Sequence, residues 1–237
     1  MYGTWVLITM LIVSSFPVIA VYIWYRFAKY PVSLIKLLIT LLIGAAAIFP
    51  AILLQNLVSL FSPSGNRAAL FYEFFFRIAF SEELSRMMLL FIFFLLAGLL
   101  KPKEDSQPLS WSSVKMGTAL GLVAGLGFAI LENAVYSASS MDINLLLLRA
   151  VTAAPIHAAC GSRVGSAAIM LRTNPAQAIF RLLSATAIHG IYNLMVTMPG
   201  FPIILAILIA FSALITAILS IKGSWEGEGL DKTVKNK

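Results

Sequence analysis

The residues best suited to chemistry stand in one short run, residues 81–86 (SEELSR), which opens a long apolar stretch. A charge near the core of a bilayer costs about 2.5–3.5 kcal/mol, so charged groups kept there are by default functional and have partners nearby. On a helix, Glu82 and Arg86 lie four residues apart on one face and can pair. Glu83 points elsewhere, about 100° around the helix.

Three further polar clusters interrupt later apolar runs. They are Glu132 with Asn133 and Tyr136, His157 alone, and His189 with Asn193. At a rise of about 1.5 Å per residue, these clusters and the carboxylate pair all fall between the outer third and the midplane of the membrane. Neighbouring spans run in opposite directions, so the order of the spans alone does not require these clusters to lie at the same depth. It predicts one common site, with Asn133 and Tyr136 in supporting roles.

A metal-dependent hydrolase is one chemistry that these residue types allow. Histidine nitrogens and carboxylates hold Zn²⁺ and leave a position open for water. The predicted ligands are His157, His189 and Glu82, with Glu132 either a further ligand or a supporting partner of one. This reading is slightly favoured because three acids and two histidines exceed what a metal-free scheme uses. Arg86 would keep the carboxylate pair ionised or fix its orientation.

A metal-free hydrolase is the alternative. Glu82 or Glu83 would take a proton from water that His157 orients. His189 and Asn193, spaced four residues apart on one helical face, would then donate hydrogen bonds to the developing oxyanion. The sequence leaves open which glutamate is the base.

The elements that position these residues are membrane helices. Of 237 residues, 60% are hydrophobic and only 11% charged, with a mean hydropathy of +0.93. Non-alternating apolar runs of about 20 residues are typical of spanning helices. The sequence therefore predicts an all-α polytopic membrane bundle of about seven transmembrane helices. The predicted spans are 4–25, 33–60, 70–100, 113–139, 144–171, 177–198 and 201–221.

Two features inside these spans predict how they pack. Gly117, Gly121 and Gly125 form a stripe of small residues at every fourth position, which favours close packing against another helix. Pro155 is expected to bend the span that carries His157 and so to open space beside that side chain.

Basic residues mark alternate connections between the spans. They are Arg26 and Lys29, then Lys101, Lys103 and Lys115, then Arg172 and Arg181, then the lysines of the C-terminal tail. The positive-inside rule places the N-terminus outside, the C-terminus in the cytoplasm and the common site in the outer half of the bilayer. Charges dispersed in this way argue against a nucleic-acid partner, despite a net charge of +7. One transmembrane domain (1–222) precedes a tail (223–237) predicted to be disordered.

The polar clusters resemble the motifs of the PrsW family of intramembrane proteases. Residues 82–86 resemble the family's Glu-Glu-x-x-Lys element, with Arg86 where lysine is usual. Residues 127–136 (GFAILENAVY) resemble its second element, 149–158 its third, and 189–193 (HGIYN) its fourth. The resemblance covers about residues 70–200, and the pattern is also similar to that of CAAX-processing and bacteriocin-immunity-type membrane proteases.

The resemblance implies hydrolysis of a peptide bond in a membrane-associated protein within the bacterial cytoplasmic membrane. PrsW-like proteins are associated with cleavage of anti-sigma factors from the outer side, and they are classed as metallopeptidases, whereas the prenyl-protein proteases work through glutamate. The expected partners are a membrane protein or peptide substrate and the lipid bilayer, and no oligomeric state is predicted.

Two functions of other classes compete with a protease. Intramembrane Glu and His chains also serve as proton relays in transporters, although the sequence shows no inverted repeat. A non-catalytic protein that binds a membrane peptide or lipid would keep the cavity and tolerate the loss of Glu82 or Glu83. A single pocket would favour a hydrolase, whereas a path across the membrane would favour a transporter.

Overall fold

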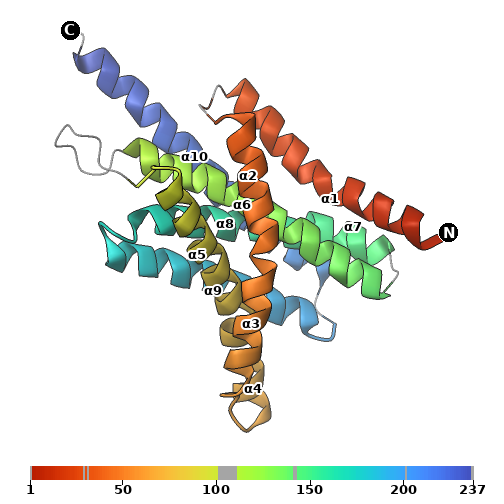
Figure 1. Ribbon diagram of the computed structural model, residues 1–237. Helices are drawn as coiled ribbons and strands as arrows, with labels where there is room; N and C mark the ends of the chain where they lie inside the picture. The colour runs from red at the N-terminus through yellow and green to blue at the C-terminus, as the bar shows by residue number, and fades with distance from the viewer. Residues whose placement is uncertain are drawn as a thin grey trace.

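The computed structural model describes residues 2–28, 30, 32–100, 111–140, 143–200 and 202–235, and every element in this part of the chain is a helix (Figure 1). The first elements are α1 (Tyr2–Phe27), α2 (Leu34–Ala46), α3 (Ile48–Ser59), α4 (Asn66–Tyr72), the π-helix η1 (Glu73–Phe80) and α5 (Ser81–Leu96). The later ones are α6 (Trp111–Ser140), α7 (Ile143–Val151), α8 (Ala153–Met170), α9 (Pro175–Thr197) and α10 (Ile203–Lys235). The predicted all-α class is therefore confirmed.

Helices α6 and α8 pack along each other in the middle of the bundle. Helices α1, α9 and α10 pack around this pair, whereas α2–α3 and η1–α5 form two neighbouring rods that cross it (Figure 1). Helix α4 lies at the end of the two rods that projects from the bundle (Figure 1). The crossing brings the start of α5 against α8 and α9, the two helices that carry the histidines.

Close approach of α6 and α8 depends on their glycines. A Cβ built at Gly121 would lie 2.7 Å from Cα of Gly165, and one built at Gly125 would overlap the backbone carbonyl of His157. Real Cβ atoms do not approach other atoms this closely, so the two backbones can touch only where side chains are absent. The predicted packing role of the glycine stripe is confirmed, and the contact at Gly125 fixes the backbone of His157.

Two prolines divide long apolar runs into pairs of helices. Proline lacks an N–H group and its ring clashes with the carbonyl four residues earlier. Helix α7 ends at Val151, four residues before Pro155, and α2 ends at Ala46, four residues before Pro50. The predicted bend at Pro155 is confirmed, and it lies just before His157.

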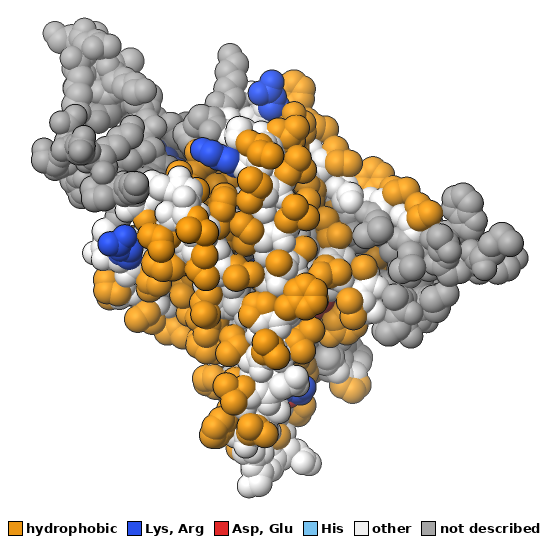
Figure 2. Space-filling model, viewed as in Figure 1, with side chains coloured by type: hydrophobic (Ala, Val, Ile, Leu, Met, Phe, Trp, Pro, Cys, Tyr) orange, Lys and Arg blue, Asp and Glu red, His pale blue; other side chains and the backbone are white. Residues whose placement is uncertain are grey.

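The outer surface of the bundle is apolar. Hydrophobic side chains dominate the face shown in Figure 2, and only a few Lys or Arg side chains are visible on it. Among the described residues, five helices are long and apolar enough to cross a membrane: Leu34–Ser59, Val114–Tyr136, Asn144–Met170, Pro175–Thr197 and Ile203–Lys222. The chain is an integral membrane protein, and these five segments match five of the seven predicted spans.

The two remaining predicted spans correspond to other helices. Helix α1 covers span 4–25, and η1 with α5 covers most of span 70–100. Lys101 and Lys103, part of the charge pattern, lie outside the described residues. Helix α10 continues to Lys235, through most of the tail that the sequence predicted to be disordered, and the side chains beyond Lys222 also lie outside the described residues.

Candidate active site

Five ionisable side chains from four helices meet at the place where the two rods cross the central pair. Glu82 and Glu83 come from the first turn of α5, Glu132 from α6, His157 from α8 and His189 from α9. Glu82, Glu83, His157 and His189 are each at most 5% exposed. The sequence predicted that these residues share one site, and the structure brings them into contact.

One half of the cluster is a chain from Arg86 through Glu83 to His189. Both Arg86 and Glu83 are fully buried, and the guanidinium Nη2 forms an ion pair with Glu83 Oε1. The same carboxylate oxygen lies 2.9 Å from His189 Nδ1. Because an ionised carboxylate can only accept, Nδ1 is the donor, and in the neutral ring the other nitrogen, Nε2, is then the acceptor.

The sequence allowed Arg86 to pair with Glu82, but in the structure Arg86 pairs with Glu83. Positions three and four residues apart are both neighbours on a helix, so local geometry permits either pair. The choice is made by the surroundings: Arg86 also donates to the backbone carbonyl of His157 at 3.3 Å, on the side where Glu83 lies. Glu82 turns instead to Gln55 of α3, which donates to its Oε1 at 3.2 Å.

The other half of the cluster holds His157. Its Nε2 lies 2.7 Å from Glu132 Oε2, and Arg149 Nη2 lies 2.7 Å from the same oxygen. Arg149 Nε donates to Asn133 Oδ1 at 2.8 Å, and its guanidinium carbon lies 4.1 Å from the centre of the Tyr136 ring. Arg149 therefore holds Glu132, and it is itself held by Asn133 and Tyr136.

The two imidazole rings lie edge to face, and one nitrogen of each ring is not used in the contacts with Glu83 and Glu132. Their ring centroids lie 4.8 Å apart at an interplanar angle of 81°. His157 Nδ1 and Glu82 Oε2 are buried without a hydrogen-bond partner in the described part of the chain. His189 Nε2 lies 3.8 Å from Glu82 Oε2, beyond hydrogen-bond distance.

The atoms of Glu82, His157 and His189 that these contacts do not use are suited to bind a metal ion. Glu82, His157 and His189 offer ligand atoms that lie within 4.8 Å of one another. In zinc sites, a ligating histidine commonly donates its other ring N–H to a carboxylate, which fixes the orientation of the ring. Glu83 and Glu132 stand in that relation to the two histidines. Of the two predicted roles of Glu132, the contacts favour that of a supporting partner, because it contacts His157 and is not in the ligand group.

Sequence reasoning missed Gln55 and Phe128. Gln55 is an amide inside the apolar span Leu34–Ser59, and that isolation is a signal that could have identified it. The Phe128 ring lies 5.2 Å from the His157 ring and 4.6 Å from the guanidinium carbon of Arg86. An aromatic residue in an apolar helix carries no comparable signal.

Asn193 is the predicted residue that the described contacts do not bring into the cluster. It lies one turn beyond His189 on α9 and is partly buried. Its backbone carbonyl accepts a hydrogen bond from Thr197, and no contact joins its side chain to the other residues within the described part. A spacing of four residues places two side chains on one face of a helix, but not at the same depth in a pocket.

A π-helix directly precedes the carboxylate pair. η1 ends at Phe80, two residues before Glu82, and π-helical turns often mark functional sites. Gly190 of α9 makes room for this element, because a Cβ at that position would lie 2.7 Å from Phe75 Cδ1. His189, the neighbour of Gly190, is thereby held close to the start of α5.

Comparisons with known proteins agree with this arrangement. The model of the PrsW family of intramembrane metalloproteases matches residues 33–219, which is most of the chain and includes every residue of the cluster. No curated protein and no solved structure matches the chain. The chain is thus a peptidase, and it belongs to the PrsW family of intramembrane metalloproteases.

Proposed function

We propose that this protein hydrolyses a peptide bond of a membrane-associated protein at the cluster of Glu82, His157 and His189. The proposal depends on one observation: His157 Nδ1 and Glu82 Oε2 are buried without a hydrogen-bond partner in the described part of the chain. Unpaired polar atoms are costly in an apolar interior unless a ligand binds to them. Of the two glutamates that the sequence left open, Glu82 is the proposed base. Each of the two carboxylates keeps one oxygen without a partner in the described part of the chain. Glu83, however, is held by Arg86 and His189, whereas the oxygen of Glu82 belongs to the group of atoms that converge with both histidines.

In the proposed reaction, Glu82 takes a proton from a water molecule as its oxygen attacks the scissile carbonyl carbon. The same carboxyl group then gives the proton to the leaving amine nitrogen as the C–N bond breaks. His157 and His189 orient the water, and their own orientations are fixed by Glu132 and Glu83. In the metal-dependent alternative, Glu82, His157 and His189 would instead hold a divalent ion such as Zn²⁺, which would supply Lewis-acid activation.

Supporting roles follow from the contacts. Arg86 holds Glu83, while Asn133 and Tyr136 hold Arg149 against Glu132. Asn193, one turn from His189, remains a proposed donor to the oxyanion. The substrate class that fits is a single-pass or membrane-attached protein, such as an anti-sigma-factor-like regulator.

The proposed setting is the bacterial cytoplasmic membrane, with seven spans, the N-terminus outside and the cluster in the outer half of the bilayer. The alternation of basic loops in the sequence supports this orientation. The contacts among the five ionisable side chains support a single site over a proton path, and a transporter is therefore not favoured.

The test is cleavage of a membrane reporter peptide by purified protein. Glu82→Gln is expected to lower the rate by at least about 100-fold, because loss of a general base typically costs 10²–10⁴. Glu73→Gln is the matched control, since Glu73 pairs with Arg77 at 2.5 Å and is one-third exposed. A Glu82→Gln variant as active as Glu73→Gln would remove Glu82 from the mechanism.

Metal content separates the two chemistries. Roughly one zinc per chain, lost in both Glu82→Ala and His157→Ala, is the expected result for a metallopeptidase site with these ligands. Wild-type protein that contains no metal and cleaves in the presence of chelator would instead establish the glutamate mechanism at the same residues.

A further inference from the structure

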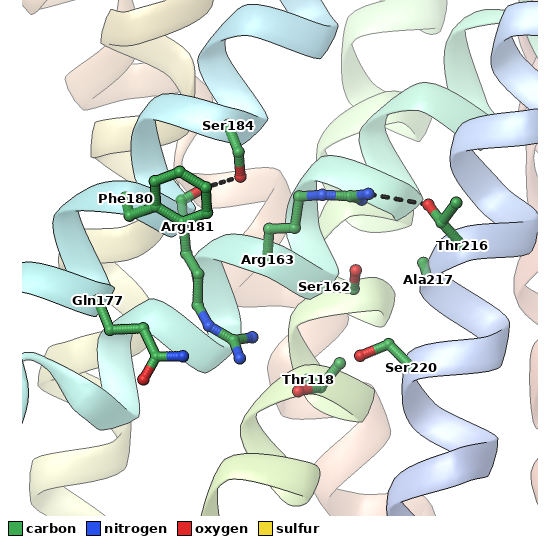
Figure 3. Close-up of a pocket in the computed structure, with 10 residues that line it drawn as sticks. All are labelled: Thr118, Ser162, Arg163, Gln177, Phe180, Arg181, Ser184, Thr216, Ala217 and Ser220. Atoms are coloured by element: carbon green, nitrogen blue, oxygen red, sulfur yellow. Dashed lines mark hydrogen bonds between the residues drawn. The ribbon is translucent and has the colours of Figure 1, made fainter.

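A second polar cavity lies apart from the catalytic cluster, between α6, α8, α9 and α10 (Figure 3). Its volume is about 230 Å³, several times the ~30 Å³ share of one water molecule. It is lined by Thr118, Ser162, Arg163, Gln177, Phe180, Arg181, Ser184, Thr216, Ala217 and Ser220. Two of these side chains are guanidinium groups, and none is a carboxylate.

The two arginines keep much of their donor capacity. Arg163 donates to the carbonyl of Ala159 and to Thr216 Oγ1, each at 2.8 Å. Arg181 donates to Ser166 Oγ at 2.7 Å and extends from α9 into the space that the lining hydroxyl groups face (Figure 3). A guanidinium has five N–H donors, so each arginine has several left for a ligand.

The positive charge of the cavity indicates that its ligand is an anion. Two guanidinium groups that line one cavity without an acid repel each other, and the low dielectric of a membrane protein strengthens this repulsion. An anion between them would remove it. Arginine is suited to phosphate in particular, because its planar fork matches two oxygens at once. The hydroxyl groups of Ser162 and Thr118 donate to backbone carbonyls of their own helices, so Ser220 is the lining hydroxyl that remains to donate to such an anion in the described part of the chain.

We propose that this cavity binds a phosphate group, most simply the headgroup of an anionic phospholipid. One wall of the cavity favours a lipid, because Phe180, which lines it, is 69% exposed. Leu219, the sequence neighbour of the lining residue Ser220, is also exposed. These side chains offer apolar surface to acyl chains. Basic pockets between transmembrane helices on the cytoplasmic side are a recurrent form of anionic lipid site.

The cavity is distinct from the catalytic cluster. Arg163 lies six residues after His157 on α8, or about 9 Å along the helix axis, and Arg181 lies eight residues before His189 on α9, or about 12 Å. Both offsets run toward the side of the bundle that the basic loops place in the cytoplasm. The site therefore sits at the opposite leaflet from the proposed active site.

The experiment is native mass spectrometry of the purified protein titrated with phosphatidylglycerol or phosphatidylcholine. Wild type is expected to bind one phosphatidylglycerol in preference to phosphatidylcholine. Arg163→Gln/Arg181→Gln is expected to weaken phosphatidylglycerol binding at least about tenfold, because charge-assisted hydrogen bonds are lost. Arg172→Gln, which removes one exposed charge outside the cavity, is the control and should bind as wild type does.

Inorganic phosphate distinguishes the source of the ligand. If millimolar phosphate displaces the lipid, or raises the melting temperature of lipid-free wild type but not of the double variant, the anion site stands and a soluble phosphate is its ligand. Equal binding of both lipids by wild type, with no effect of phosphate, would overturn the proposal. So would equal losses in the Arg172→Gln control. Should the glutamine variant not fold, Arg163→Lys/Arg181→Lys replaces it. Lysine keeps the charge but cannot bind two phosphate oxygens at once, so this variant is expected to lose the preference for phosphatidylglycerol.

Discussion

The buried pair of Glu83 and Arg86 offers a sharp test of the arrangement, through Glu83→Gln. Both side chains are fully buried, and the substitution keeps the shape of Glu83 while it removes the charge. Arg86 would then lose its ion-pair partner and keep only uncharged acceptors among the described contacts, the new amide oxygen and the backbone carbonyl of His157. Breaking a buried ion pair by removing one partner costs about 3–5 kcal/mol, so this is the expected loss in unfolding free energy.

The double variant Glu83→Gln/Arg86→Met decides whether the cost comes from the pair. With both charges gone, no buried ion is left uncompensated, and replacing a whole buried pair by neutral groups is often close to neutral. The double variant is therefore expected to be more stable than Glu83→Gln alone. Unfolding free energies of wild type, both single variants and the double variant, measured in mixed detergent and denaturant, give the coupling.

A coupling energy below about 0.5 kcal/mol would refute the reasoning, because contacting residues couple by about 0.5–3 kcal/mol. Cleavage gives an independent check. Glu83 orients His189, and loss of such a partner typically costs about 10–100-fold in activity. Stability should recover in the double variant, whereas activity should not.

Three further predictions concern the rest of the molecule. Arg149→Ala removes the contact with Glu132 and is expected to lower kcat/KM by about 10–100-fold, with partial recovery in Arg149→Lys. Gly125→Ala places a Cβ against a backbone carbonyl of α8 and is expected to cost about 1–3 kcal/mol of unfolding free energy. For topology, Ser64→Cys is expected to react with an impermeant thiol reagent from outside the cell, and Thr173→Cys only after the membrane is opened.

Each of these has a result that would contradict it. Full activity of Arg149→Ala would mean that the contact of Arg149 with Glu132 is not needed for cleavage. Wild-type stability of Gly125→Ala would mean that α6 and α8 can separate without loss. Labelling of Thr173→Cys from outside would invert the proposed orientation, and the natural Cys160 gives little background because it is buried.

The sequence alone determined the class of the protein and most of the participants in the site. Long apolar runs fixed the all-α membrane class, since a bilayer requires about 20 apolar residues per helix. Charged and imidazole groups inside those runs identified the site residues, because such groups are too costly to keep without a use. Glycines and prolines, which act locally on the backbone, predicted that α6 packs closely against another helix and that the span bends before His157, whereas the structure identifies α8 as that helix.

Only the tertiary structure decided which side chains of the site contact each other. The spacing of Arg86 allowed either glutamate, and the choice of Glu83 depends on a carbonyl 71 residues away. The partner of Glu83, His189, is 106 residues distant, and Gln55 reaches Glu82 from another span. Helical periodicity fixes the face on which a side chain lies, but not the depth or the neighbour that it meets. Those depend on the packing of helices that lie far apart in sequence, which is why Asn193 shares a face with His189 and still stands outside the cluster.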